Sequence, residues 1–127
     1  MSKRILVVDD DAGTQKLLES ILSSVGYVVE LASDGTEVQE KIMANRPDLI
    51  IMDYMMPEVD GIQTVKKILE TPAFNKMPII FLTAIVTQDR ESGAKFDIKV
   101  KFRTFKTLSK PIDSRLLIKE VAALIGS

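Results

Sequence analysis

Three short runs of consecutive apolar residues constrain the fold of this chain most. None of them alternates polar with apolar side chains, which is the pattern of strands buried on both faces of a parallel sheet. The runs are Ile5–Val8, Leu49–Met52 and Ile79–Leu82. A fourth segment, Tyr27–Leu31, includes a glutamate and is predicted to be an edge strand. Strands of this kind need helices over both faces of the sheet.

Amphipathic segments with helical spacing lie between these strands. Gly26 and Pro72 are positioned to end two of the helices, and Asp34 with Glu37 resembles a capping box. Asp113 precedes a last helix as its N-cap. Apolar side chains recur three and four residues apart within 17–25, 38–43, 62–69 and 116–124.

This alternation predicts a doubly wound α/β fold with right-handed crossovers. We expect a five-stranded parallel sheet in the order 2-1-3-4-5, whose last strand includes Thr107–Ser109. The 127 residues suit one domain, and no linker or repeat divides residues 1–127.

The segment between Thr83 and Lys110 has a different pattern. Apolar and charged residues alternate from Phe96 to Arg103, which is the period of a strand. We predict a short or missing fourth helix ending near Gly93, followed by an extended strand or hairpin that leads into the last core strand.

Composition excludes several kinds of chemistry. The chain has no Cys and no His, which removes disulfides, thiolate nucleophiles and the usual general base. No apolar run approaches the length of a membrane span, and the N-terminal apolar run is too short for a signal peptide, so we expect an intracellular, cytoplasmic domain.

Charge is balanced overall but uneven along the chain. Residues 1–94 carry nine positive and fifteen negative side chains, whereas residues 95–110 carry six positive and one negative. One short basic stripe without interleaved recognition motifs is poor evidence for direct nucleic-acid binding, which is therefore not expected. It is interpreted either as a solvated edge strand or as a docking surface for an acidic partner.

Chemically useful side chains follow four of the predicted strands. Because parallel strands deliver their carboxyl ends to one edge of the sheet, these residues become neighbours in the fold. The crevice between the first and third strands places Asp9 or Asp10 beside Asp53. Thr83 and Lys110 end the fourth and last strands. Asp11, in contrast, is predicted to be a helix N-cap.

Carboxylates gathered in this way repel one another unless they gain a proton or a counter-charge. Oxygen ligands without His or Cys favour a hard cation, and a site with room for water and phosphate oxygens favours Mg²⁺. Lys110 and Thr83 add a positive charge and a hydroxyl donor. This set of groups suits carboxylate attack on phosphorus, which yields an acyl phosphate.

These residues resemble those of response-regulator receiver domains of two-component signalling. The resemblance covers nearly the whole chain, and its long central segment is very specific. The matching segments are Arg4–Asp11, Pro47–Gly61, Thr83–Ala84 and Lys110–Pro111. The resemblance implies the flavodoxin-like receiver fold, with an atypical region around the fourth helix and fifth strand.

The resemblance also implies a role for each matching position. Asp53 would accept the phosphoryl group, and Lys110–Pro111 would be a cis peptide, which costs little before proline. Asp10 and Asp53 would bind Mg²⁺ directly, with Asp9 acting through water and Met55 through its backbone carbonyl. Contacts to the phosphoryl group would come from Thr83, Lys110 and the Ala84 N–H.

By the same resemblance, the partners are a sensor histidine kinase or a histidine phosphotransfer protein. The chain has no histidine, so it cannot be its own phosphohistidine donor and must receive the phosphoryl group from elsewhere. Residues 84–110 would form the surface that an effector or output domain recognises. The chain would catalyse only its own phosphotransfer and dephosphorylation, in bacterial signalling.

Three positions depart from the family pattern. Thr107 stands where the family usually has an aromatic switch residue, and Phe105, on the same strand face, is the candidate substitute. Met55 and Ile85 are apolar where some receivers carry polar groups that position water, so we expect slow self-dephosphorylation.

Three alternatives remain at this stage. A haloacid-dehalogenase-like phosphatase would need an Asp two residues after Asp53, where this chain has Met55. A flavodoxin-like cofactor binder is disfavoured because Asp9, Asp10 and Asp11 would repel a flavin phosphate. A degenerate receiver used as a scaffold is disfavoured by the intact acidic residues but favoured by the altered output region.

Overall fold

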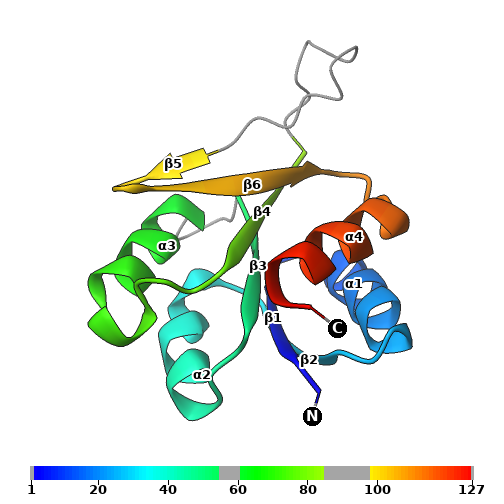
Figure 1. Cartoon of the computed structure of the whole chain (residues 1–127), viewed down its shortest axis with the longest axis horizontal. Coiled ribbons are helices and arrows are strands. Elements are labelled where there is room, and N and C mark those ends of the chain that lie inside the picture. Colours follow the sequence, from blue (N-terminus) through cyan, green and yellow to red (C-terminus); the bar gives the residue numbers. More distant parts are fainter. Residues whose placement is uncertain (1, 55–60, 85–97, 127) are drawn as a thin grey trace.

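A computed structural model describes residues 2–54, 61–84 and 98–126. One sheet runs through the molecule and carries helices on both faces (Figure 1). The order of its strands is β2-β1-β3-β4-β6-β5. The first five of these are mutually parallel, in the predicted order, and β5 is an added antiparallel edge strand. The strands are β1 (Arg4–Val8), β2 (Val28–Ala32), β3 (Leu49–Asp53), β4 (Ile79–Thr83), β5 (Ile98–Val100) and β6 (Arg103–Ser109).

The predicted N-cap residues Asp11 and Asp113 cap their helices in the structure. Asp11 caps α1 by accepting a hydrogen bond from the Thr14 N–H at 2.8 Å, and Asp113 accepts one from the Leu116 N–H at 3.1 Å. Asp34 caps a short 3-10 turn that leads into α2, rather than α2 itself. The helices are α1 (Ala12–Ser24), α2 (Val38–Ala44), α3 (Gly61–Glu70) and α4 (Ser114–Ile125), with 3-10 turns at Gly35–Glu37 and Pro72–Phe74.

Two apolar clusters flank the sheet, one on each face. Side chains of α2 and α3 pack with Phe81 and Phe105 on one face, whereas side chains of α1 and α4 pack with Leu82 and Leu108 on the other. Every residue of β3 and β4 is buried, as the unbroken apolar runs predicted. The two central strands therefore hold their carboxyl ends in fixed positions.

The hairpin formed by β5 and β6 confirms one of the two predicted forms of this region. Ile98 and Val100 are buried and Lys99 between them is exposed, in agreement with a period of two. The alternation does not continue to Phe102, however, because the chain turns there: Lys101 has a φ of 55° and the Phe102 side chain is 98% exposed. The predicted short fourth helix lies outside the described residues.

Among the helices of the described ranges, none combines the length and the apolar character that crossing a membrane requires.

Candidate active site

Three carboxylates meet at the carboxyl edge of the sheet, as the strand order predicted. Asp9 and Asp10 follow β1, and Asp53 ends β3. Each offers an oxygen that lies within 4.8 Å of the other two. Asp9 and Asp53 are buried, whereas Asp10 is exposed. The cluster therefore has one side open to solvent and two carboxylates fixed in the protein.

Hydrogen bonds from the N-cap and the first turns of α1 hold Asp9 in place. Its Oδ1 accepts a hydrogen bond from the Asp11 N–H at 2.9 Å. The Gln15 side-chain amide donates to the carbonyl oxygens of Asp9 at 2.5 Å and of Ala32 at 3.2 Å, joining the ends of β1 and β2. The sequence does not indicate this role of Gln15, since a glutamine in the first turns of a helix resembles any solvated helix residue.

Lys110 supplies a counter-charge to the buried carboxylates. Its ammonium lies 2.9 Å from Asp9 Oδ2 and 3.7 Å from Asp53 Oδ2. Burial by itself lowers the pKa of Lys110, but the ion pair with Asp9 and the charges of Asp53 and Asp10 outweigh burial and raise this pKa above its ordinary value. The amine therefore stays protonated at neutral pH and offsets part of the carboxylate repulsion.

The backbone around Lys110 is joined directly to β4. The Lys110 N–H donates to the carbonyl oxygen of Thr83 at 2.9 Å, and the Lys110–Pro111 peptide is cis, as expected. Thr83 is buried at the end of β4. The structure thus brings Thr83 and Lys110 to the same edge as the carboxylates, and Ala84 follows as an exposed residue.

Gly61 determines how closely α3 approaches the end of β3. Its N–H donates to the carbonyl oxygen of Tyr54 at 3.1 Å. A Cβ added at Gly61 would overlap the carbonyl oxygen of Asp53 and would lie 3.1 Å from Met52 Cγ. The glycine of the central segment is therefore required because the backbone that carries Asp53 occupies the space of a side chain.

Several predicted positions lie away from this cluster or outside the described residues. Phe105 is buried on the α3 side of the sheet and packs edge-on against Phe81, with ring centroids 5.8 Å apart. Thr107 is also buried, and its hydroxyl has no hydrogen-bond partner among the described residues. Met55 and Ile85 lie outside those residues, so the predicted Met55 carbonyl ligand and the expected slow dephosphorylation stay predictions.

The donor set fits a divalent cation. All the candidate side-chain ligands are carboxylate oxygens, and the exposed Asp10 gives solvent access to the two buried ones. Hard cations such as Mg²⁺ prefer oxygen ligands and retain several waters. Three carboxylates beside one ammonium favour the binding of a divalent cation, which would offset their mutual repulsion.

Comparisons with known proteins point in the same direction as this geometry. The family model described as "Response regulator receiver domain" matches residues 5–122. Response regulator MprA of Mycobacterium ulcerans (strain Agy99) is 46% identical over 84 residues, which is 66% of this chain. The same match covers 35% of the MprA chain, so this sequence corresponds to about a third of that relative.

Solved structures resemble the whole chain. The receiver domain of sensor histidine kinase PA1611 from Pseudomonas aeruginosa PAO1, which has a magnesium ion in its active site cleft, is 31% identical. It matches with a TM-score of 0.80 and covers 100% of both chains. Chemotaxis protein CheY4 of Vibrio cholerae is 27% identical, with a TM-score of 0.80 over 98% of this chain and 99% of that one.

Proposed function

The chain belongs to the response regulator receiver domain family, and on that premise we propose that Asp53 accepts a phosphoryl group from a partner's phosphohistidine. Receiver domains are signalling domains of bacterial two-component systems. The observation that carries the proposal is the Lys110 ammonium between the buried carboxylates of Asp9 and Asp53, at 2.9 Å and 3.7 Å. The donor would be a sensor histidine kinase or a histidine phosphotransfer protein.

The transfer follows from the groups on this edge. An Asp53 carboxylate oxygen attacks phosphorus, the bond from phosphorus to the histidine nitrogen breaks, and the imidazole leaves with that electron pair. Lys110, already protonated and close to Asp53, neutralises an oxygen of the transferring group. The Thr83 hydroxyl and the Ala84 N–H, at the end of β4, would contact the other phosphoryl oxygens.

Asp10 and Asp53 are the proposed direct ligands of Mg²⁺, with Asp9 acting through water and the Met55 carbonyl completing the protein ligands. When bound, the cation would offset the negative charge that gathers on phosphate and carboxylate oxygens. Asp9 also holds the Lys110 ammonium beside the carboxylate cluster through their ion pair.

The receiver unit would span residues 1–127, and the reaction would take place in the cytoplasm. Phosphorylation would shift a pre-existing equilibrium of the 84–110 surface, through Thr83 and Lys110, toward a form that an effector or output domain binds. Lys110 is suited to this coupling because its N–H is bonded to Thr83 while its ammonium lies at Asp53.

Intact-mass measurement tests the phosphoacceptor. The purified chain is incubated with acetyl phosphate and Mg²⁺, and we expect the mass of one phosphoryl group to be added to the native chain but not to Asp53→Asn. Asp48→Asn is the matched control, because Asp48 precedes the opposite end of β3 and should not affect labelling. Undiminished labelling of Asp53→Asn would reject the proposal.

Thermal unfolding in a Mg²⁺ titration tests the metal site separately from phosphotransfer. A ligand that binds only the folded state raises its stability, by about 2.7 kcal/mol at a hundred times its Kd. We expect Mg²⁺ to raise the Tm of the native chain and to have little effect on Asp10→Asn. An equal rise in both proteins would show that the cation binds elsewhere.

A further inference from the structure

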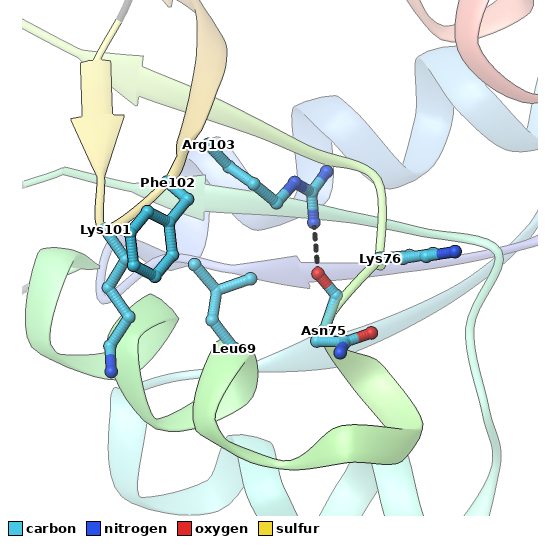
Figure 2. Close-up of a pocket in the computed structure, with 6 residues that line it drawn as sticks. All are labelled: Leu69, Asn75, Lys76, Lys101, Phe102 and Arg103. Carbon is cyan, nitrogen blue, oxygen red and sulfur yellow. Dashed lines mark hydrogen bonds between the residues drawn. The ribbon is translucent and has the colours of Figure 1, made fainter.

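A pocket lies at the edge of the sheet opposite to the carboxylate cluster. It has a volume of about 470 Å³ and lies between the turn of the β5–β6 hairpin and the connection from α3 to β4. Figure 2 shows the Phe102 ring beside Leu69, with Lys101 and Lys76 on opposite sides of them. The lining residues are Leu69, Asn75, Lys76, Lys101, Phe102 and Arg103.

Contacts at its base fix the turn that carries Phe102. Arg103 Nη1 donates to the carbonyl oxygens of Asn75 at 3.1 Å and Met77 at 2.8 Å. The Arg103 guanidinium also lies over the ring of the buried Phe105, 4.5 Å from its centroid. Lys101 Nζ is 3.7 Å from Glu70 Oε2 on α3. The exposed aromatic side chain therefore projects from an anchored turn.

Exposure of Phe102 is unusual for a side chain of this kind. The side chain is 98% exposed, whereas the other described phenylalanines, Phe74, Phe81 and Phe105, are all buried. An aromatic side chain that projects beside a pocket is suited to anchor a partner protein, because binding hot spots are enriched in aromatic residues.

The charges around the pocket define the partner that would fit it. Its six lining residues include three cations and no carboxylate. We propose that this pocket binds an acidic segment of a partner protein, which inserts an aromatic or aliphatic side chain against Phe102 and Leu69. Carboxylates on either side of that anchor would lie near Lys76 and Lys101, which attract an acidic segment and repel a basic one.

This interaction goes beyond phosphotransfer and does not depend on it. The carboxylate cluster lies at the carboxyl ends of β1 and β3, whereas Asn75 and Lys76 precede the amino end of β4. The pocket residues and Asp53 lie at opposite edges of the sheet, so the segment would bind both phosphorylated and unphosphorylated chains.

Panning a displayed library of random short peptides on the folded chain tests the proposal. We expect enrichment of acidic peptides that contain an aromatic or leucine residue. A labelled peptide from that set should bind about tenfold or more weakly to Phe102→Ser, because the apolar anchor is lost. Met43→Ser is the matched control, since Met43 is also an exposed apolar side chain, 74% exposed on α2, but lies outside the pocket.

Charge and phosphorylation are varied in the same assay. Lys76→Glu should weaken binding and reduce its salt dependence, whereas Lys119→Glu on α4 should not. Asp53→Asn should bind like the native chain, so the pocket is tested even where phosphotransfer fails. A backbone amide spectrum of Phe102→Ser that matches the native spectrum away from the turn shows that the variant is folded.

Several results would overturn the proposal. Enriched peptides without acidic residues, or equal binding to Phe102→Ser and the native chain, would exclude the acidic segment. Dimers of the native chain that dissociate in Phe102→Ser would identify a second copy as the occupant. Phe102-dependent binding of a single-stranded oligonucleotide in place of peptides would identify nucleic acid.

Discussion

Gly61 joins the start of α3 to the backbone of the proposed phosphoacceptor. Gly61→Ala places a methyl group where the carbonyl oxygen of Asp53 lies. We expect the free energy of unfolding to fall by about 1–3 kcal/mol, because overpacking forces backbone shifts that exceed the better helix propensity of alanine. Urea unfolding measures the loss, and slower labelling by acetyl phosphate would accompany it.

Gly13→Ala is the control for this substitution. Gly13 also lies near the start of a helix, α1, but the nearest atom to its added Cβ is Asp11 Oδ2, on a side chain, at 3.3 Å. We expect it to change stability much less than Gly61→Ala does. Equal effects of the two variants would show that the contact with Asp53 is not the cause.

The residues that meet at the carboxyl edge were largely predictable from the sequence. Asp9, Asp53 and Thr83 each follow an apolar run and Lys110 follows the predicted last strand, and parallel strands bring such positions together whatever their separation along the chain. The contribution of Gln15 was not predictable in this way. It depends on where the first turns of α1 lie above β1 and β2, and the apolar pattern does not report that placement.

At the scale of the elements, the Arg103 side chain joins the β5–β6 hairpin to the connection between α3 and β4. Arg103→Ala removes two hydrogen bonds to backbone carbonyls and the contact with the Phe105 ring. We expect a loss of about 2 kcal/mol in the free energy of unfolding, because hydrogen bonds from a charged donor are among the stronger ones. Amide exchange at Ile98–Val100 should become faster.

Two further variants show whether the positive charge of Arg103 or the shape of its guanidinium stabilises the hairpin: Arg103→Lys keeps the charge, and Lys99→Ala is the control. Lysine keeps the charge but lacks the planar guanidinium that lies over the Phe105 ring, so it should recover only part of the loss. Lys99 is exposed on β5, and its removal should be nearly neutral. Full recovery by lysine would show that charge alone anchors the hairpin.

The position of the hairpin turn could not be read from the sequence. The turn is at Lys101 and Phe102, without the glycine, proline or asparagine that usually marks one. In the sequence, the alternation of apolar and charged residues runs through the turn without a break, so it does not mark where the chain reverses. Arg103, for the same reason, resembled the other cations of the basic stripe, although it is the one bonded to Asn75 and Met77.

Glu120 shows a similar limit on α4. A glutamate in an amphipathic helix is expected on the solvated side, but Glu120 is 4% exposed and lies 2.7 Å from Lys106 Nζ on β6. The pairing depends on where α4 crosses the sheet, which the helical period alone does not determine.

At the scale of the whole molecule, acid should weaken the fold partly through two helix caps. The Thr14 hydroxyl and N–H lower the pKa of Asp11, and the Thr36 hydroxyl and N–H lower that of Asp34. A carboxylate whose folded-state pKa is lowered adds stability above its ordinary pKa, and that stability is lost as pH falls through the lower value. Protonation of both caps should therefore contribute to acid unfolding.

The double variant Asp11→Asn and Asp34→Asn tests this contribution. Asparagine is also a good N-cap but does not titrate, so the variant should lose less stability than the native chain between about pH 5 and pH 2. Urea unfolding across that range gives both slopes. Parallel slopes would show that other carboxylates account for the acid sensitivity.

Strand β6 connects the pocket at Phe102 with the edge of the sheet where Asp53 would be phosphorylated. Its seven residues run from Arg103 at the pocket to Ser109 beside Lys110, a distance of about 20 Å at the usual rise of a strand. A protein tethered by a short segment at the pocket would stay within reach of the phosphorylated edge. Its local concentration there would be on the order of millimolar. Even a weak second contact with the carboxyl edge would then let its binding depend on whether Asp53 is phosphorylated.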